Sequence, residues 1–347
     1  MVCLNDSGII KLTDMKGKKD KLAKWLHLTG LLRLLNFGSS KYCIVLNYHR
    51  IRASFHHETL FDDEVFGPDQ QEFRKQVEWL TKNSDVLSEE DLIAIVQGKH
   101  RPPGRSVVIT FDDGYIDNYT LAYPVLQKYH APAIFFIPTQ SIEERRLGWW
   151  DYFAYLLKAT KKTEVVFEGK CLQPKERLQE AMHFVLHFID QNKQDVSVIL
   201  DSLRKACEVD FPGPDEQDKE LMSWDQLEEV SNNGISIGAH SHSHQVLSSL
   251  DSGQQKHEVE YSRAIIEQRI GKTVRSMSYP VGNYHHFSED TKRIAFDAGY
   301  ELAFSFLTGV NTYGAIDPMD VKRVAVSNYF PRFVGTMELS RLFCDSV

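Results

Sequence analysis

The chain has 347 residues, of which 42% are hydrophobic, and it carries a formal net charge of −8 at pH 7 with a pI near 6.0. This length accommodates a large α/β domain with an insertion, and the acidic balance argues against a dedicated nucleic-acid-binding protein, which would carry a basic patch. The five cysteines are scattered and form no Cys-x-x-Cys pair, which fits neither a disulfide framework nor a thiolate zinc site and favours a reducing compartment.

Residues 1–40 are predicted to form an amphipathic helical segment. A basic stretch, Lys16–Lys24, precedes an apolar one, Trp25–Phe37, in which His27 and Arg33 interrupt the hydrophobic run. The run is too short to span a bilayer and lacks the small-residue cleavage site of a secretory signal. We expect this helix to dock on the protein or, as the slightly weaker alternative, to make peripheral contact with a membrane surface. Without a recognisable signal peptide, we expect a cytoplasmic protein.

Residues 41–330 contain seven short runs rich in apolar residues that predict β-strands. Most are continuous apolar runs, which is typical of strands buried on both faces of a parallel sheet. Helical patterns separate the strands, so the chain alternates between strand and helix and predicts either a wound α/β sheet or an irregular (β/α) barrel. The strands are expected at Tyr42–Tyr48, Val107–Ile109, Pro132–Pro138, Ile235–Ala239, Met277–Pro280, Leu302–Phe306 and Val321–Val326.

Among the intervening helices, Gln70–Lys82 has one apolar face, Ser88 is expected to cap a short helix, and Tyr115–Tyr129 is expected to be helical throughout. The pattern changes between about residues 149 and 221, where polar helices surround a short ribbon, and we expect a helical insertion that covers the site like a lid. Residues 331–347 are expected to form a C-terminal tail.

The first functional motif is SVVITFDDGY, Ser106–Tyr115, in which two carboxylates follow a buried strand. In parallel α/β sheets, ligands bind where strands end at their carboxyl ends. Successive strand residues point to opposite sides, so Asp112 and Asp113 can serve one site only if the chain turns at Gly114. One carboxylate would then hold a metal and the other would handle a proton. The alternative is that Asp112 or Asp113 merely caps the following helix.

The second motif is ISIGAHSHSH, Ile235–His244, which again places polar residues at the end of a strand. The spacing of His240 and His244 brings two imidazoles to one side of a turn, as a metal ion requires. With Asp113 they form a set of two histidines and one carboxylate that suits Zn²⁺ or another divalent transition metal better than Mg²⁺ or Ca²⁺. Asp112 could then take a proton as the activated water attacks a carbonyl. A solvated turn is the alternative.

The third motif is SMSYPVGNY, Ser276–Tyr284. Tyr279 and Pro280 close a strand, and Gly282 allows the backbone to approach a ligand closely. The backbone N–H of Val281 could donate to a developing oxyanion. Taken alone, this segment fits an ordinary exit from a strand equally well.

Together, TFDDGY (Thr110–Tyr115), HSHSH (His240–His244) and SYPVG (Ser278–Gly282) resemble the NodB-homology polysaccharide deacetylase family, a carbohydrate esterase type. The likeness covers about Lys41–Tyr329 without the insertion and is closest in style to the poly-N-acetylglucosamine N-deacetylase branch. It implies a distorted (β/α)₇ barrel, a divalent metal that is usually Zn²⁺, with Co²⁺ or Ni²⁺ as alternatives, and hydrolytic removal of N- or O-acetyl groups from a glycan.

The resemblance also implies roles for individual residues. Asp112 matches the catalytic base, and Asp113, His240 and His244 match the metal ligands. Val281 matches the residue whose backbone N–H stabilises the oxyanion.

This chain departs from the family pattern at two positions. Ser278 stands where many members have an arginine that orients the base, and Arg275 and Arg323 are the two candidates to replace that arginine in space. No Leu-x-His segment follows Val326 to supply the general-acid histidine of many members. His49, which follows the first strand, resembles the acid histidine of the poly-N-acetylglucosamine N-deacetylase branch. A histidine that only caps the strand end is the alternative.

Aromatic residues near the motifs are candidates for substrate contact. Trp149 and Trp150 could stack on sugar faces, or they could belong to the core-facing side of the first helix of the insertion. The predicted substrate-binding set is Tyr115, Trp149, Trp150, Tyr279, Pro280 and Gly282.

The leading hypothesis is a metal-dependent N-deacetylase that acts on an N-acetylated glycan or glycan precursor. A second hypothesis keeps the chemistry and changes the substrate to a small or lipid-linked amide, as in a deformylase or amidase. A third is a glycan-binding module that has lost catalysis, which only the absent arginine and C-terminal histidine support. The sequence leaves the glycan and the oligomeric state open.

Overall fold

The computed structural model of this chain describes residues 42–54, 59–101, 104, 106–191 and 196–339. The predicted amphipathic segment over residues 1–40 therefore lies outside the described residues, as does the end of the predicted tail. None of the described helices combines the length and the apolar character needed to cross a membrane.

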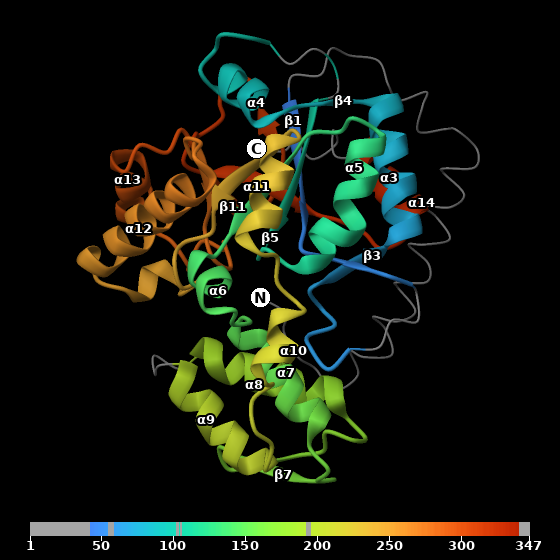
Figure 1. Cartoon of the computed structure of the whole chain (residues 1–347), viewed down its shortest axis with the longest axis vertical. Helices are drawn as coiled ribbons and strands as arrows, with labels where there is room; N and C mark the ends of the chain where they lie inside the picture. The colour runs from blue at the N-terminus through green and yellow to red at the C-terminus, as the bar shows by residue number, and fades with distance from the viewer. Residues whose placement is uncertain (1–41, 55–58, 102–103, 105, 192–195, 340–347) are drawn as a thin grey trace.

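Within the described residues, seven parallel strands close into a barrel (Figure 1). Strand β1 completes the ring because it pairs with both β5 and β13. The barrel is irregular, since β9 and β10 share a single residue pair, Met277 with Ala239. The distorted (β/α)₇ barrel is thus confirmed. Its strands are, in barrel order, β1 (Tyr42–Tyr48), β5 (Ser106–Asp112), β6 (Ala133–Ile137), β9 (Ile235–Ala239), β10 (Ser276–Ser278), β11 (Leu302–Thr308) and β13 (Val321–Ala325).

Alternate residues of each strand face the barrel interior and the surrounding helices. Val45 and Val108 pack in the interior cluster, whereas Leu46 and Ile109 pack in the larger cluster outside. The interior is tight, because a Cβ on Gly238 would lie 2.5 Å from the Phe136 ring. Four further short strands lie at the margins: β12 (Asn311–Thr312) pairs with β1, β4 (Asp85–Val86) pairs with β5, and β2 (Arg50–Arg52) pairs with β3 (Phe66–Asp69).

The helices surround the barrel, with α3, α5 and α14 on one side and α12 and α13 on the other (Figure 1). The predicted cap is confirmed, because Ser88 and Asp91 form a capping box at α4. The barrel helices are α3 (Gln70–Asn83), α4 (Glu89–Val96), the π-helix η1 (Asn118–Ala122), α5 (Tyr123–Lys128), α6 (Thr139–Glu144), α11 (Trp224–Asn232), the 3₁₀ helix η2 (Leu247–Ser249), α12 (Ser252–Ile270), α13 (Glu289–Asp297) and α14 (Phe330–Leu339).

Three local expectations need correction. The predicted helix over Tyr115–Tyr129 is a π-helix followed by an α-helix. The α-helix has a proline in its first turn, and a proline has no backbone N–H to donate. Neither Asp112 nor Asp113 caps it, because Asp112 ends β5 and Asp113 begins a turn. Within the predicted tail, 331–347, residues 331–339 belong to α14, whose Phe333 packs edge-on against Trp79 of α3.

The segment between α6 and α11 has a hydrophobic cluster of its own, which includes Phe153, Leu157 and Phe167. Figure 1 shows its helices grouped at one end of the molecule, next to the barrel. Its elements are α7 (Trp149–Ala159), the hairpin β7 (Val165–Phe167) and β8 (Lys170–Leu172), α8 (Leu178–Gln191), α9 (Val196–Cys207) and α10 (Pro214–Asp218).

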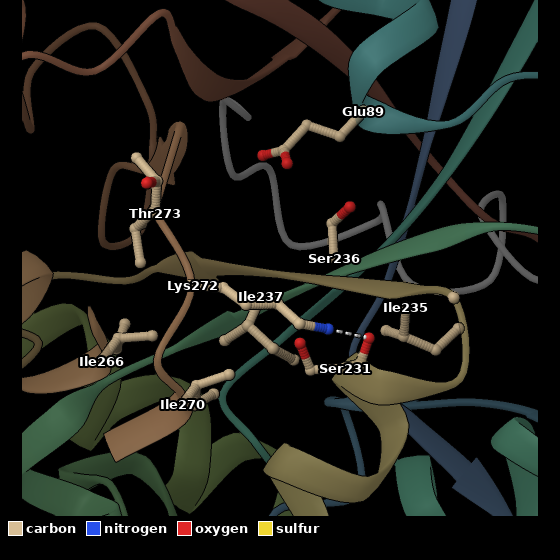
Figure 2. A pocket seen from close by; sticks show the side chains of 11 residues that line it. Glu89, Ser231, Ile235, Ser236, Ile237, Ile266, Ile270, Lys272 and Thr273 are labelled. Atoms are coloured by element: carbon tan, nitrogen blue, oxygen red, sulfur yellow. Dashed lines mark hydrogen bonds between the residues drawn. The ribbon is translucent and has the colours of Figure 1, made fainter. Parts of the chain in front are cut away.

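A cavity of about 200 Å³ lies at the amino ends of β9 and β10, bordered by Glu89, Ser236 and Lys272 (Figure 2). Glu89 is buried, hydrogen-bonds the Ser276 hydroxyl and has a pKa that burial raises. The Lys272 ammonium donates to the Ser231 carbonyl oxygen at 2.6 Å. This end of a parallel barrel serves stability, and the functional residues of such barrels lie at the opposite, carboxyl end of the strands.

Candidate active site

On several strands, the residues that face the barrel interior are apolar at first and polar at the carboxyl end of the barrel. On β5, for example, Val108 is followed at alternate positions by Thr110 and Asp112. The barrel closure brings these ends together, although the residues come from distant parts of the chain. The converging residues are Asn47 and His49 from β1 and the loop after it, Asp112 from β5, His240 after β9, Ser278 from β10 and Arg323 from β13.

Asp113, His240 and His244 form a buried cluster that could hold a metal ion. The Nε2 atoms of His240 and His244 lie 3.6 and 3.5 Å from Asp113 Oδ1, and the ligand atoms of all three lie within 4.8 Å of one another. A tetrahedral Zn²⁺ with bonds of about 2.0–2.1 Å would place its ligands about 3.4 Å apart. Asp113 Oδ1 has no hydrogen-bond partner among the described residues. The donor set and this unsatisfied oxygen therefore fit a divalent transition metal.

The protonation states of the three residues also bear on metal binding. Burial lowers the pKa of His240, and burial together with His240 lowers the pKa of His244 well below the usual value, so both imidazoles are neutral. Burial, reinforced by Asp112 and Asp151, raises the pKa of Asp113 well above that of a free carboxyl. Metal ligands must be deprotonated, so Asp113 is the residue whose proton competes with a metal.

The backbone is strained at three of the predicted site residues. Asp113, His244 and Val281 have φ angles of 76°, 56° and 60°, in the left-handed region. Aspartate and histidine tolerate this region better than most residues, but a β-branched residue there is a genuine outlier. Such conformations cost about 1–3 kcal/mol each and cluster at functional sites. The strain thus falls on two ligand candidates and on the candidate oxyanion donor.

Asp112 is fixed by a buried arginine. The Arg323 guanidinium donates to Asp112 Oδ1 at 2.8 Å, to the Ser278 hydroxyl at 2.7 Å and to the Ser305 carbonyl oxygen at 2.9 Å. Burial alone would raise the pKa of Asp112, but the positive charge and the hydrogen bond of Arg323 oppose burial, and that pKa lies below the usual value. Asp112 is therefore ionised at neutral pH and aimed at the site.

The arginine missing at Ser278 thus has a counterpart in space, and it is Arg323 rather than Arg275. Arg275 precedes β10 and pairs with Glu301 at 2.6 Å, at the other end of the barrel.

His49 lies at the rim beside the base. Its Nε2 is 4.0 Å from Asp112 Oδ2, and the side chain is 27% exposed. Its backbone carbonyl accepts a hydrogen bond from the Asn118 amide at 2.7 Å, which fixes the end of β1. Burial lowers the pKa of His49 to about 4, although Asp112 acts in the opposite direction. His49 is therefore neutral at pH 7, with its Nε2 facing the base.

The turn after β10 presents a backbone N–H at the rim. Val281 is 39% exposed, and its N–H has no hydrogen-bond partner in the part of the chain that the structure describes. The next residue, Gly282, accepts from the Phe306 N–H at 2.7 Å, so the turn is bound to the end of β11. This arrangement leaves the Val281 N–H available for a ligand.

Replacing Gly282 with alanine should disturb this turn. Gly282 has φ of 68°, and a Cβ there would lie 2.6 Å from the Phe306 backbone nitrogen, so the backbone must shift. We expect the free energy of unfolding to fall by about 1–3 kcal/mol, as for other strained positions, and the oxyanion donor to move. Chemical denaturation would measure the loss. A Gly314→Ala variant is the control, since it also has positive φ but no neighbour within 4 Å. Equal losses in both variants would show that only φ matters.

Most residues predicted to contact substrate are buried. Tyr115 and Trp150 hydrogen-bond each other, and the Tyr279 hydroxyl donates to the Met319 carbonyl oxygen at 2.9 Å. Trp149 lies edge-on to Trp150, with ring centroids 5.6 Å apart. Pro280 and Gly282 are buried as well. The burial of these residues indicates that they support the site rather than contact a substrate.

Sequence reasoning missed one residue at the rim. Phe306 is 38% exposed, and its ring lies edge-on to that of His49 with centroids 6.0 Å apart. It continues the inward series of Leu302 and Phe304 on β11, so strand alternation could have identified it.

Comparisons with known proteins agree with this geometry. The family model described as polysaccharide deacetylase matches residues 99–303, more than half of the chain. YxkH of Bacillus subtilis (strain 168) is 25% identical over 232 residues, which cover 67% of this chain and 56% of that protein. A poly-beta-1,6-N-acetyl-D-glucosamine N-deacetylase of Staphylococcus aureus (strain N315) is 32% identical over 108 residues, which cover 29% of this chain and 37% of that enzyme. The chain thus matches about half of YxkH and little over a third of the staphylococcal enzyme.

Among solved structures, the deacetylase PplD of Streptococcus pyogenes, in complex with acetate, superposes with a TM-score of 0.58 at 18% identity. The superposition covers 86% of this chain and 98% of that chain, which supports the shared fold. The resemblance carried by the three motifs is confirmed, and this chain belongs to the polysaccharide deacetylase family.

Proposed function

We propose that this chain is a metal-dependent deacetylase that removes N-acetyl groups from an N-acetylated glycan. The observation that carries this proposal is the pairing of Asp112 with Arg323 directly beside the cluster of Asp113, His240 and His244. An ionised base next to residues that could hold a metal ion is an arrangement suited to the hydrolysis of an amide by an activated water. Similarity to the staphylococcal enzyme favours an N-acetylglucosamine polymer as the substrate class.

Each residue has a proposed task. Asp113, His240 and His244 would hold the ion, which when bound supplies Lewis-acid chemistry and lowers the pKa of a coordinated water. Asp112 would accept a proton from the water that attacks the acetyl carbonyl carbon, because Arg323 keeps the Asp112 carboxylate ionised and oriented. The Val281 N–H donates to the carbonyl oxygen as it gains negative charge.

His49 completes the reaction. A neutral His49, whose Nε2 is 4.0 Å from Asp112 Oδ2, can accept the proton that Asp112 has taken and pass it to the glucosamine nitrogen. The C–N bond then breaks, and the products are acetate and a free amine. This route needs no further acid, and in this chain no histidine follows His286.

The substrate class can be tested by comparing acceptors. We expect N-acetylglucosamine oligomers to give a kcat/KM at least about tenfold higher than N-acetyl or N-formyl derivatives of small amines, because remote sugar contacts contribute binding energy. Release of acetate or formate and appearance of the free amine would be measured together. A small amide hydrolysed as fast as the oligomers would instead favour the amidase hypothesis.

The raised pKa of Asp113 predicts how metal affinity depends on pH. Because the proton on Asp113 must leave before the metal binds, affinity should fall as pH falls, by up to about tenfold per pH unit below that pKa. Burial lowers the pKa of both histidines, so their protons compete with the metal at lower pH than free imidazoles would. Competition with a chromophoric chelator between pH 5 and 8 measures the effect. An affinity for Zn²⁺ that is constant across this range would contradict the assignment.

The apo protein offers a matching test of stability. Burial raises the pKa of Asp113 in the folded state. Between the pKa of the unfolded chain and this higher folded value, the folded state holds a proton that the unfolded state has released. The stability of the apo protein therefore falls as pH rises across this interval. Asp113→Asn removes the buried carboxylate. We therefore expect this variant to have a higher apo Tm at pH 7 and to bind no Zn²⁺. A lower apo Tm would show that Asp113 is stabilised in some other way.

A further inference from the structure

The insertion contacts the candidate metal cluster through the ring of Trp150. The Trp150 ring of α7 lies against the His244 ring, with centroids 4.5 Å apart and planes inclined by 57°. Both side chains are buried. No other ring contact joins the insertion to the three candidate ligands within the part of the chain that the structure describes.

The two histidines of the cluster are oriented differently. His240 Nδ1 lies 2.8 Å from the Ser278 carbonyl oxygen, which can only accept, so a hydrogen bond fixes this ring with Nε2 toward Asp113. His244 Nδ1 has no hydrogen-bond partner among the described residues, although its Nε2 also faces Asp113. Ligating histidines normally have such a partner to set their orientation. His244 lacks this hydrogen bond, and the ring of Trp150 packs against it instead.

Trp150 is itself held by a directed chain of hydrogen bonds. Its indole N–H, which can only donate, lies 2.7 Å from the Tyr115 hydroxyl. That hydroxyl must then donate to Asp151 Oδ2, also at 2.7 Å, and the Asp62 N–H donates to Asp151 Oδ1 at 3.0 Å. Tyr115 stands two residues after Asp113, so the same chain connects the turn of one ligand to the ring that packs on another.

The start of α7 is shaped around this tryptophan. A Cβ on Gly148 would lie 2.3–2.5 Å from atoms of the Trp150 ring. The φ of Gly148 is −68°, which any residue can adopt, so the glycine is needed for space and not for backbone conformation. A side chain at this position would displace the Trp150 ring.

We infer that Trp150 is a positioning residue of the metal site, which holds His244 in its ligating orientation and makes the insertion a part of that site. The inference rests on the metal site of the proposed function. The inference predicts that metal affinity depends on residues that are not themselves metal ligands. Tyr115 and Asp151 act through Trp150, because they fix the edge of its indole ring.

Zn²⁺ affinity of the full chain, measured by chelator competition, tests this inference. We expect Trp150→Leu and Gly148→Ala to weaken Zn²⁺ binding by about 10–100-fold, as loss of an orienting partner does, and to alter the visible spectrum of bound Co²⁺. Trp150→Phe retains a ring against His244 and should lose less. Trp79→Phe, in α3 against Phe333, is the matched control and should bind as the unaltered chain does.

The outcomes separate the two proposals. A purely structural role would lower the apo Tm of the Trp150 and Gly148 variants yet leave Zn²⁺ affinity and the Co²⁺ spectrum unchanged, and this result would overturn the inference. If Trp150→Leu does not fold, Gly148→Ala and Trp150→Phe provide the same comparison. Failure of the unaltered chain to bind Zn²⁺ would refute the metal site of the proposed function and the inference with it.

Discussion

Replacing Asp112 with asparagine should lower kcat for deacetylation by about 10²–10⁴-fold, the usual contribution of a general base. Asparagine has the same shape and can still accept a hydrogen bond from Arg323, but it cannot take a proton. Because Asp112 is not among the candidate ligands, the variant should still bind one Zn²⁺. Acetate release and metal stoichiometry would be measured on the same preparation.

A suitable control for this variant is Asp225→Asn, which alters an exposed aspartate in the first turn of α11 and should leave kcat unchanged. If Asp112→Asn retained full activity, a different residue would have to accept the proton. If it lost both activity and metal, Asp112 would be a ligand instead.

The second large effect is expected from Arg323→Met. Arg323 is 1% exposed and pairs with a buried Asp112, so its removal leaves a buried carboxylate without a partner. Breaking such a pair costs about 3–5 kcal/mol. The double variant Arg323→Met with Asp112→Asn should recover part of this loss, because no charge then remains unpaired. Chemical denaturation of the single and double variants measures the difference.

The Arg323→Met substitution should shift the pH dependence of activity in one direction. With Arg323 present, the pKa of Asp112 in the folded state is lower than that of a free aspartate. The ionised Asp112 therefore stabilises the fold above the usual aspartate pKa, and this stabilisation is lost as pH falls through the lower folded pKa. Without Arg323, burial dominates and the pKa of Asp112 rises. Activity of the variant should therefore fail first at acid pH and recover as pH increases. If the acidic side of the pH–activity profile did not move, Arg323 would not control the pKa of Asp112.

Arg275→Met is the matched control. Arg275 forms a partly exposed pair with Glu301, and such pairs contribute about 0–1 kcal/mol. We expect a small change in stability and no shift in the pH profile. A large effect at both arginines would mean that general packing, rather than the contact with Asp112, is responsible.

The fold was largely predictable because the strands of a closed barrel are buried on both faces. Their sequences are therefore short apolar runs, and the polar residues that follow Ile109 and Ala239 mark the end where ligands bind. Helix α14 was not predictable in the same way, because its buried Phe333 packs against Trp79, more than 250 residues earlier in the chain.

The choice between the two arginines depended on three-dimensional position. Arg275 precedes β10, so it lies at the amino end of the barrel, whereas Arg323 is an inward-facing residue of β13. Strand order brings β13 next to β1, and Arg323 thereby reaches Asp112. Residue type alone could not distinguish them.

Trp149 and Trp150 show the same limitation on a helix. Neighbouring helical residues point about 100° apart, and the sequence does not say which of them faces the barrel. In the structure Trp150 faces His244, while Trp149 stacks on Phe153 within the insertion.

The most direct test of the proposed mechanism is acetate release from N-acetylglucosamine oligomers by metal-stripped protein, before and after Zn²⁺ is returned. We predict negligible release without metal and restored release with one Zn²⁺ per chain, since Asp113, His240 and His244 offer one site. Full activity of the metal-free protein, or no release despite stoichiometric Zn²⁺, would contradict metal-dependent deacetylation.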